Sequence, residues 1–238
     1  MSSCKKPENF SLRKNFTRKE GRKETVVLSV AAGPALEIMN ILNEYPAEEF
    51  KFLALDHDIK TLRNVTAQIS DKRFYYGLAN AFQIMKGKYH IASPRAMLRR
   101  YCNPRKDFKG FRKILCPILY KMGVLKKEKY DLVYAAGLYD YIKTFLNDET
   151  KGTIALTRHL FDMVKPGGSL IIGNFNHSNP KDVRFVMDYI CDWELIYRDK
   201  QEMYDFARTI PETQIGGMEI LEEPLGINYF LEIKKYFG

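Results

Sequence analysis

The chain has 238 residues, of which 45% are hydrophobic and 28% charged, and its formal net charge is +9. This apolar fraction excludes an intrinsically disordered chain, and the length suits one α/β domain with an added segment. No run of 18 apolar residues is present, so we expect no transmembrane helix, and the basic start of the chain lacks an apolar leader. The cysteines form no paired motif, which predicts reduced thiols in a cytoplasmic protein without a metal site. They are Cys4, Cys102, Cys116 and Cys191.

The positive charge is concentrated in two segments. Residues 1–24 carry eight basic and three acidic side chains, and residues 84–129 carry fourteen basic and two acidic ones. The rest of the chain is therefore net acidic, at −8. We expect a basic arm followed by an acidic body with a basic insert, and this pattern favours an anionic substrate or partner. The alternative for both segments is an ordinary solvated surface.

Strand and helix patterns alternate from residue 25 onward. A nearly continuous β-branched run over 25–31 is typical of a strand buried on both faces of a parallel sheet. The predicted strands are 25–31, 50–55, 74–78, 130–135 and 169–173, and the predicted helices are 35–42, 59–69, 150–164 and 180–191. A terminal hairpin is expected from 218–222 and 228–234. This alternation predicts the α/β class, with a doubly wound and mostly parallel sheet.

The insert at 84–129 interrupts the alternation. Apolar residues recur at helical spacing over 107–122, and a second short helix is expected over 94–101. This helical insert is either a cap packed on the body or a lid over an active site, and a membrane-docking amphipathic helix is a third alternative. The domain prediction is an arm at 1–24 followed by one domain at 25–238.

The turn after the first strand and the acidic end of the second strand point to a nucleoside ligand. Gly33 lets the backbone approach a ligand closely, and the helix that follows offers its N-terminal amides. The turn lacks the full G-x-G-x-x-G pattern and has no phosphate-loop lysine. Asp56 closes the second strand about 20 residues later, where a carboxylate can accept both hydroxyls of a ribose. Asp58 fits better as the N-cap of the next helix.

Two further segments, Asp131–Tyr141 and Lys165–His177, run from predicted strands into polar loops, and the second contains a Pro-Gly-Gly turn. Together these segments resemble the class I S-adenosylmethionine-dependent methyltransferases over roughly residues 24–237, apart from the insert. The resemblance implies a seven-stranded sheet whose last strand is antiparallel, with S-adenosyl-L-methionine as the cofactor. The cofactor-binding residues that it implies are Ala31, Ala32, Gly33, Asp56, His57, Asn80, Ala81 and Ala136. The first three would lie beside the methionine part, Asp56 would hold the ribose with His57 beside the adenosine, and Asn80 and Ala81 would flank the adenine.

A narrower resemblance is carried mostly by the C-terminal half. The strings at 137–141, 165–180, 187–198 and 226–230 are similar to those of bacterial methyltransferases that make 3-hydroxy fatty acid methyl ester signals of the "extracellular factor" type. This resemblance implies O-methylation of a small acidic or acyl substrate. The basic insert departs from the shorter segment expected in that group.

The need for a catalytic base depends on the acceptor. A carboxylate acceptor is already ionised at neutral pH, and the cofactor brings the electrophile, so no strong base is required. A hydroxyl or amine acceptor would need one, and the candidate catalytic residues are Asp140, His177 and Tyr139. Trp193 is expected to be a core residue. The residues expected to line the acceptor pocket are Tyr141, Asn174, Phe175 and Asn176.

Two other functions remain open at this point. The basic segments would suit an RNA methyltransferase, although no Asn/Asp-Pro-Pro-aromatic string follows the fourth predicted strand and no RNA-binding module precedes the core. The other alternative is a non-catalytic protein with the cofactor fold, whose basic surface docks an acidic partner such as an acyl carrier protein.

Overall fold

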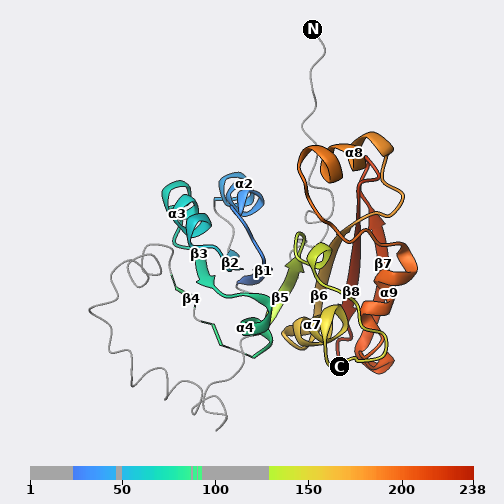
Figure 1. The fold of residues 1–238 in the computed structure, drawn as a ribbon. Helices are drawn as coiled ribbons and strands as arrows, with labels where there is room; N and C mark the ends of the chain where they lie inside the picture. Colours follow the sequence, from blue (N-terminus) through green and yellow to red (C-terminus); the bar gives the residue numbers. More distant parts are fainter. Residues whose placement is uncertain (1–23, 47–49, 87, 90, 93–128) are drawn as a thin grey trace.

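Eight strands of the computed structural model form one mixed sheet (Figure 1). The structure describes residues 24–46, 50–86, 88–89, 91–92 and 129–238. The strands are β1 (Thr25–Val30), β2 (Phe50–Asp56), β3 (Phe74–Leu78), β4 (Ile91–Ala92), β5 (Tyr130–Ala135), β6 (Val164–Phe175), β7 (Ile215–Glu222) and β8 (Asn228–Lys235). Their order is β4-β3-β2-β1-β5-β6-β8-β7, with β3, β2, β1, β5 and β6 parallel.

The predicted architecture is confirmed. The five parallel strands and the antiparallel hairpin of β7 and β8 make the expected seven-stranded doubly wound sheet. The two-residue β4 pairs antiparallel with β3 and adds an eighth strand that the sequence did not predict. β1 is buried along most of its length because helices cover both faces of the sheet, which explains its continuous apolar run.

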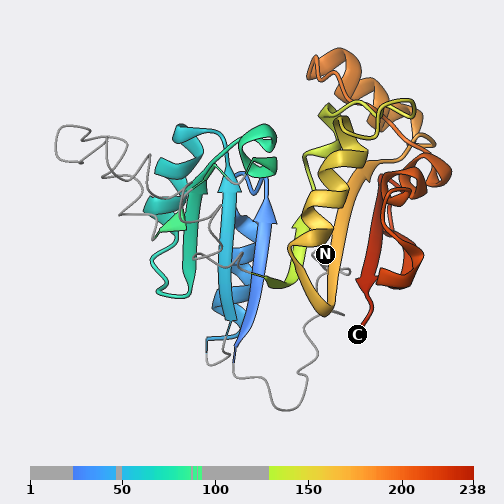
Figure 2. The same cartoon turned by 90° about the horizontal axis from the view of Figure 1, so that it is seen from below.

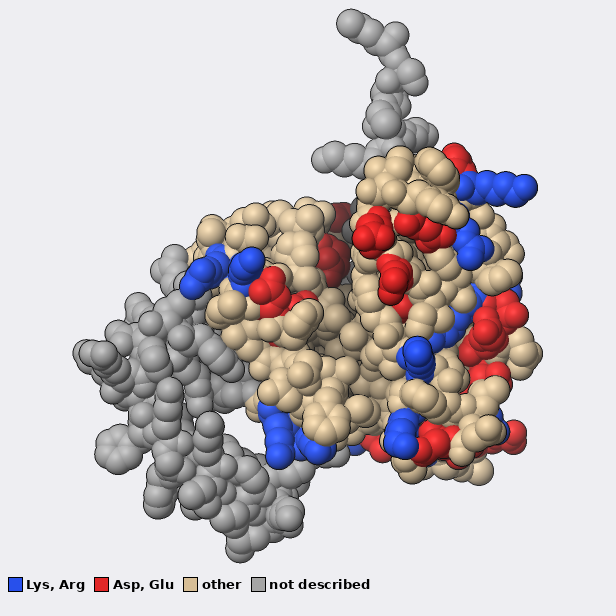
Figure 3. Space-filling model, in the orientation of Figure 1, with Lys and Arg blue, Asp and Glu red and all other residues tan. Residues whose placement is uncertain are grey.

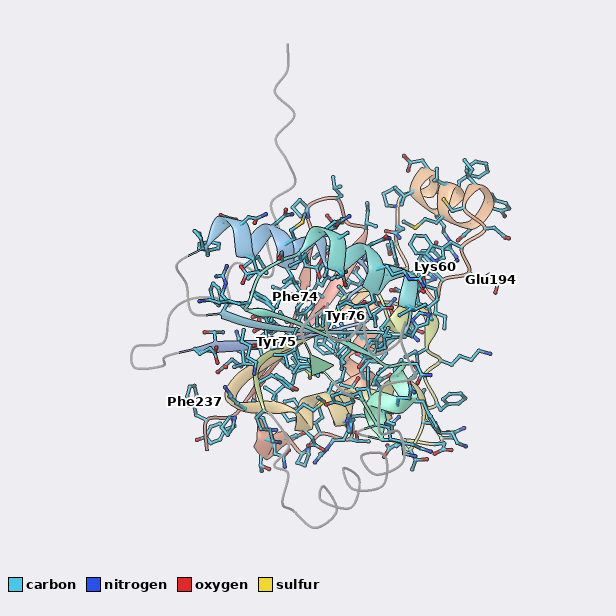
Figure 4. All side chains as sticks on the ribbon, turned by 90° about the vertical axis from the view of Figure 1, so that its left-hand side faces the viewer. Lys60, Phe74, Tyr75, Tyr76, Glu194 and Phe237 are labelled. Carbon is cyan, nitrogen blue, oxygen red and sulfur yellow. The ribbon has the colours of Figure 1, made fainter. Side chains whose placement is uncertain are left out.

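Helices lie on both faces of the sheet (Figures 1 and 2). The helices are α2 (Leu36–Glu44), α3 (Ile59–Gln68), α4 (Ala81–Met85), α7 (Gly152–Asp162), α8 (Lys181–Phe185) and α9 (Lys200–Tyr204). Buried side chains of α2 and α3 share one core with one face of the sheet, and those of α4, α7 and α9 share a second core with the other face. Figure 4 shows the alternation in β3, where Phe74 and Tyr76 belong to the first core and Tyr75 packs against the second.

Several element bounds differ from the prediction. The predicted strand 169–173 is part of the longer β6, which runs on to Phe175 because its antiparallel partner β8 continues opposite it as far as Asn228. The predicted helix 180–191 is α8 followed by a π-helical turn, Val186–Ile190. Helix α2 begins at Leu36, one position later than predicted. Helix α9 was not predicted at all.

The arm and most of the insert lie outside the described residues. Glu24 is the last residue of the predicted arm and the first that the structure describes. The predicted insert helices at 94–101 and 107–122 fall within 93–128, which the structure does not describe. Within the part of the insert that is described, Ile91–Ala92 is a strand rather than a helix. None of the helices in the described ranges has the length and apolar character needed to cross a bilayer.

Candidate functional site

The carboxyl ends of the five parallel strands meet at one edge of the sheet. The chain leaves β1 toward β2 in one direction and leaves β5 toward β6 in the other, so the topological switch lies between β1 and β5. A Cβ built at Gly33 or at Gly137, which follow these two strands, would meet no heavy atom within 4 Å. By contrast, a Cβ at Gly173 in β6 would lie 2.9 Å from the carbonyl oxygen of Ala136. The edge of the sheet is therefore open at the switch and closed beside it.

Figure 3 shows the same opening as a recess between the half of the molecule that carries α2 and α3 and the half that carries α8. Acidic side chains are visible within it from this side. Ligands of doubly wound sheets bind at this position, beyond the carboxyl ends of the strands at the switch.

The turn after β1 has an unusual backbone. Ala31, Gly33 and Ala35 have φ values of 55°, 52° and 53°, so every second residue is left-handed. Glycine adopts this conformation without strain, whereas alanine does so at a cost. The G-x-G-x-x-G pattern is therefore incomplete in this turn, because alanine occupies the other two left-handed positions.

Asp56 ends β2 directly beside this turn. Its Oδ2 accepts a hydrogen bond from the Gly33 amide at 2.8 Å, and its Oδ1 accepts one from the Asp58 amide at 2.9 Å. An ionised carboxylate has about four acceptor positions, so two remain for the hydroxyls of a sugar. The exposed His57 lies next to it, with Nδ1 3.4 Å from Oδ1 of Asp56. Asp58 caps α3 through the Lys60 amide, as predicted.

The other predicted cofactor residues lie at the same edge. Ala32 is buried in the turn after β1, and Ala136 is exposed directly after β5. Asn80 follows β3 and caps α4, where its Oδ1 accepts the Gln83 amide at 2.9 Å. Ala81 is the first residue of that helix. The open turn, the Asp56 carboxylate and the polar end of β3 thus lie together at one edge of the sheet.

Three of the predicted acceptor-side residues are buried, and their side chains are hydrogen-bonded within the protein. Tyr139 is fully buried, and its hydroxyl lies 2.9 Å from that of Thr157. Asn174 is fully buried and donates to the carbonyl oxygens of Phe175 and Ile196. Asn176, directly after β6, is buried too; it forms an isolated parallel bridge with Arg198, and its Nδ2 donates to the Gly226 carbonyl. The side chains of all three form hydrogen bonds within the protein, and their place beside an acceptor stays a prediction.

Arg198 organises this region, and the sequence did not single it out. Its side chain is 2% exposed as a residue, and Nη1 donates to the Tyr139 carbonyl at 2.8 Å and to Oδ1 of Asn174 at 2.6 Å. Nη2 donates to the Ile142 carbonyl. Burial lowers the pKa of the guanidinium. A basic residue whose partners lie more than 20 positions away leaves no local pattern by which it could be found.

Asp140 and His177 differ in their surroundings. Asp140 is buried, and its Oδ1 accepts the Phe175 amide at 2.7 Å. Burial raises the pKa of this carboxyl to about 6. His177 is exposed, and its amide donates to the Arg198 carbonyl at 2.9 Å. Asp140 therefore ties a 3₁₀ turn at Tyr139–Tyr141 to the end of β6, while the imidazole of His177 is free to meet solvent.

An aromatic surface lies at the carboxyl end of β6. The Phe175 and Trp193 rings are 6.1 Å apart, and the indole nitrogen of Trp193 donates to the Tyr141 hydroxyl. Trp193 is 42% exposed, so the expectation of a core tryptophan was wrong. The exposed rings of Phe185 in α8 and of Tyr189 in the π-helical turn stack on each other, with their centroids 5.3 Å apart. The structure thus brings two predicted acceptor residues, Tyr141 and Phe175, together on an apolar surface.

Comparison with known proteins identifies the fold. No protein-family model and no curated protein matches the chain. Solved structures that resemble it include the S-adenosylmethionine-dependent methyltransferase SibL (13% identity, TM-score 0.55), the CurJ carbon methyltransferase (12%, 0.56) and an O-methyltransferase family protein from Burkholderia thailandensis (14%, 0.50). They are matched over 90%, 92% and 90% of this chain, which spans about half of each, 51%, 50% and 52%. The fold is that of the class I S-adenosylmethionine-dependent methyltransferases.

Proposed function

We propose that the protein is an S-adenosylmethionine-dependent methyltransferase. The observation that carries the proposal is the opening between β1 and β5, bordered by the left-handed turn at 31–35 and by Asp56. The turn would hold the methionine part of the cofactor, and Asp56 the ribose hydroxyls. His57, Asn80, Ala81 and Ala136 would border the adenosine at the same edge.

The acceptor that we propose is a small acidic or acyl compound, such as a 3-hydroxy fatty acid, methylated on oxygen. The C-terminal strings support this class, and the exposed Tyr141 and Trp193 with the half-buried Phe175 offer an apolar contact for an acyl chain. When bound, the cofactor supplies an electrophilic methyl group. The protein would then orient the acceptor oxygen and exclude water.

A carboxylate acceptor needs no proton transfer, whereas a hydroxyl acceptor does. Asp140 would be largely ionised at neutral pH, since its pKa is about 6, but it must gain access to the acceptor to act as a base. The exposed His177 is the alternative base. The RNA and acidic carrier-protein alternatives rest on residues 1–24 and 84–129, and no contact of the described residues favours them.

The test is cofactor binding by calorimetry, followed by transfer of a labelled methyl group to 3-hydroxy fatty acids and to bulk transfer RNA. Asp56→Asn should weaken S-adenosylmethionine binding about 10- to 100-fold, since a hydrogen bond to a charged group contributes ~1.5–3 kcal/mol. Asp182→Asn, which changes an exposed carboxylate on α8, is the matched control and should bind normally. Failure of the wild-type protein to bind the cofactor would refute the proposal, and methylation of RNA alone would refute the acyl acceptor.

A further inference from the structure

Glu37 is an acidic residue at the switch that the resemblance does not assign. It lies in the first turn of α2, two residues after the left-handed Ala35. Its Oε1 accepts a hydrogen bond from the Tyr134 hydroxyl of β5 at 2.8 Å, although the two residues are 97 positions apart. The carboxylate therefore lies between α2 and β5, on the boundary where Gly33 and Gly137 are open.

The Glu37 carboxylate lacks a cationic partner among the described residues. Its hydrogen bonds are with the Tyr134 hydroxyl and with its own backbone amide, and the ion pairs of the described ranges do not include it. The side chain is half-buried between α2 and β5, and this loss of solvent raises the pKa of its carboxyl. A half-buried carboxylate without a counter-charge loses part of its hydration, and a cationic ligand group in the adjacent opening would offset that loss.

The two carboxylates at this edge are suited to different tasks. Asp56 accepts two backbone amides and keeps positions for neutral hydroxyl donors. Glu37 accepts one hydroxyl and lies on the α2 side of the turn, where the methionine part of the cofactor is proposed to lie. That part ends in an α-ammonium group, a strong donor that needs an acceptor when it leaves water.

We propose that Glu37 binds the α-ammonium group of the cofactor and that Tyr134 positions the Glu37 carboxylate for this contact. The inference rests on the proposed function. It adds a residue that discriminates ligands with an amino-acid end from ligands with the nucleoside alone.

The experiment measures the dissociation constants of three probes by calorimetry. S-Adenosylmethionine and S-adenosylhomocysteine both carry the α-ammonium group, whereas 5′-methylthioadenosine lacks the amino-acid end. Glu37→Gln keeps the shape of the side chain and removes its charge. It should weaken binding of the first two probes about tenfold or more and leave methylthioadenosine unchanged.

Three further variants complete the design. Tyr134→Phe removes the positioning hydroxyl and should lower the affinity for S-adenosylmethionine and S-adenosylhomocysteine about threefold. Asp56→Asn should weaken all three probes, since each contains the ribose. Glu44→Gln, at the other end of α2, is the matched control and should change none.

The pH dependence gives a readout that a merely structural role would not produce. As pH falls toward the raised pKa of Glu37, its carboxylate is protonated and loses its attraction for an ammonium group. The affinity of the wild-type protein for S-adenosylmethionine relative to methylthioadenosine should therefore fall as the pH is lowered. The ratio should show no such fall in Glu37→Gln.

The outcomes separate the inference from the proposed function. If the wild-type protein binds none of the probes, the proposed function fails and the inference falls with it. If it binds them and Glu37→Gln weakens all three equally or none of them, the inference alone is overturned. If Glu37→Gln does not fold, Glu37→Asp and Tyr134→Phe test the inference instead. Both variants must then reduce the preference for the probes that carry the ammonium group, and an unchanged preference would overturn the inference.

Discussion

Ala31 and Ala35 are the residues at which the local backbone and the residue type disagree most clearly. Both are left-handed, with φ near that of Gly33 between them. A non-glycine residue in this conformation costs ~1–2 kcal/mol, and such strain persists only where the surrounding structure imposes it. The strain lies at the opening between β1 and β5, where we place the cofactor.

Ala31→Gly should stabilise the protein. It relieves the left-handed strain, and the greater freedom of glycine in the unfolded chain cancels only roughly 0.5–1 kcal/mol of that gain. We expect the free energy of unfolding to rise by about 0.5–1 kcal/mol, measured by urea denaturation.

Ala155→Gly provides the control with the opposite sign. Ala155 lies inside α7 with ordinary helical geometry, and glycine there should cost about 1 kcal/mol. A loss of stability in Ala31→Gly as large as that in Ala155→Gly would show that position 31 is not strained.

At the scale of elements, Asp140 joins the 3₁₀ turn at Tyr139–Tyr141 to the end of β6 through the Phe175 amide. Burial raises the pKa of its carboxyl from 3.8 to about 6, so the folded protein holds the proton more tightly than the unfolded chain does. Between these two pH values the folded state binds more protons, and stability therefore falls as pH rises from 4 to 6.

Asp140→Asn should remove this loss of stability. Asparagine keeps an oxygen that accepts the Phe175 amide, and it does not ionise. At pH 7 the variant should be more stable than the wild type by roughly 3 kcal/mol, and the difference should shrink as the pH falls toward 4. Denaturant titrations from pH 4 to 7 would measure this, with the exposed Asp182→Asn as control. A wild type that gains stability over this interval relative to Asp140→Asn would contradict the prediction.

The elements also show where sequence reasoning succeeds. Strands β2, β3 and β5 lie within one residue of their predicted bounds, because strands buried on both faces are continuous apolar runs that end where polar residues begin. The hairpin of β7 and β8 was predicted from its turn and is confirmed. Helix α9 has only five residues, too few for its apolar periodicity to be recognised.

The candidate site was predicted less completely than the fold. Asp56 could be proposed from the sequence because its distance from Gly33 along the chain carries a signal, and its role stays a prediction. The sequence did not point to Glu37 or Arg198, because their hydrogen-bond partners Tyr134 and Tyr139 lie 97 and 59 residues away along the chain. Burial, which separates Asn174 from Phe175 at the end of one strand, depends on tertiary packing that spacing does not encode.

At the scale of the whole molecule, the cofactor would contact residues from both sides of the switch. At a concentration 100 times the dissociation constant, a ligand stabilises the folded state by ~2.7 kcal/mol. For a domain of this size that corresponds to a rise in Tm of about 5–10 °C.

A thermal scan should show this rise with S-adenosylmethionine and a much smaller one in Asp56→Asn. Nicotinamide adenine dinucleotide, a nucleotide without the amino-acid end, is the control ligand and should cause no shift. An equal rise with both ligands would indicate a general nucleotide site rather than a methyl-donor site.

The two halves of the sheet, one ending at β1 and the other at β5, are joined by few strand-pairing positions. β1 and β5 pair at three positions, whereas β1 and β2 pair at six. Beyond the last paired position, Oδ2 of Asp131 accepts the Val26 amide at 2.9 Å, and the same oxygen accepts the Lys165 ammonium at 2.7 Å. The Asp131 side chain thus extends the contact between β1 and β5 at the end of these strands that is remote from the ligand opening. A change at Asp131 can therefore alter how β1, β5 and β6 meet without touching a ligand.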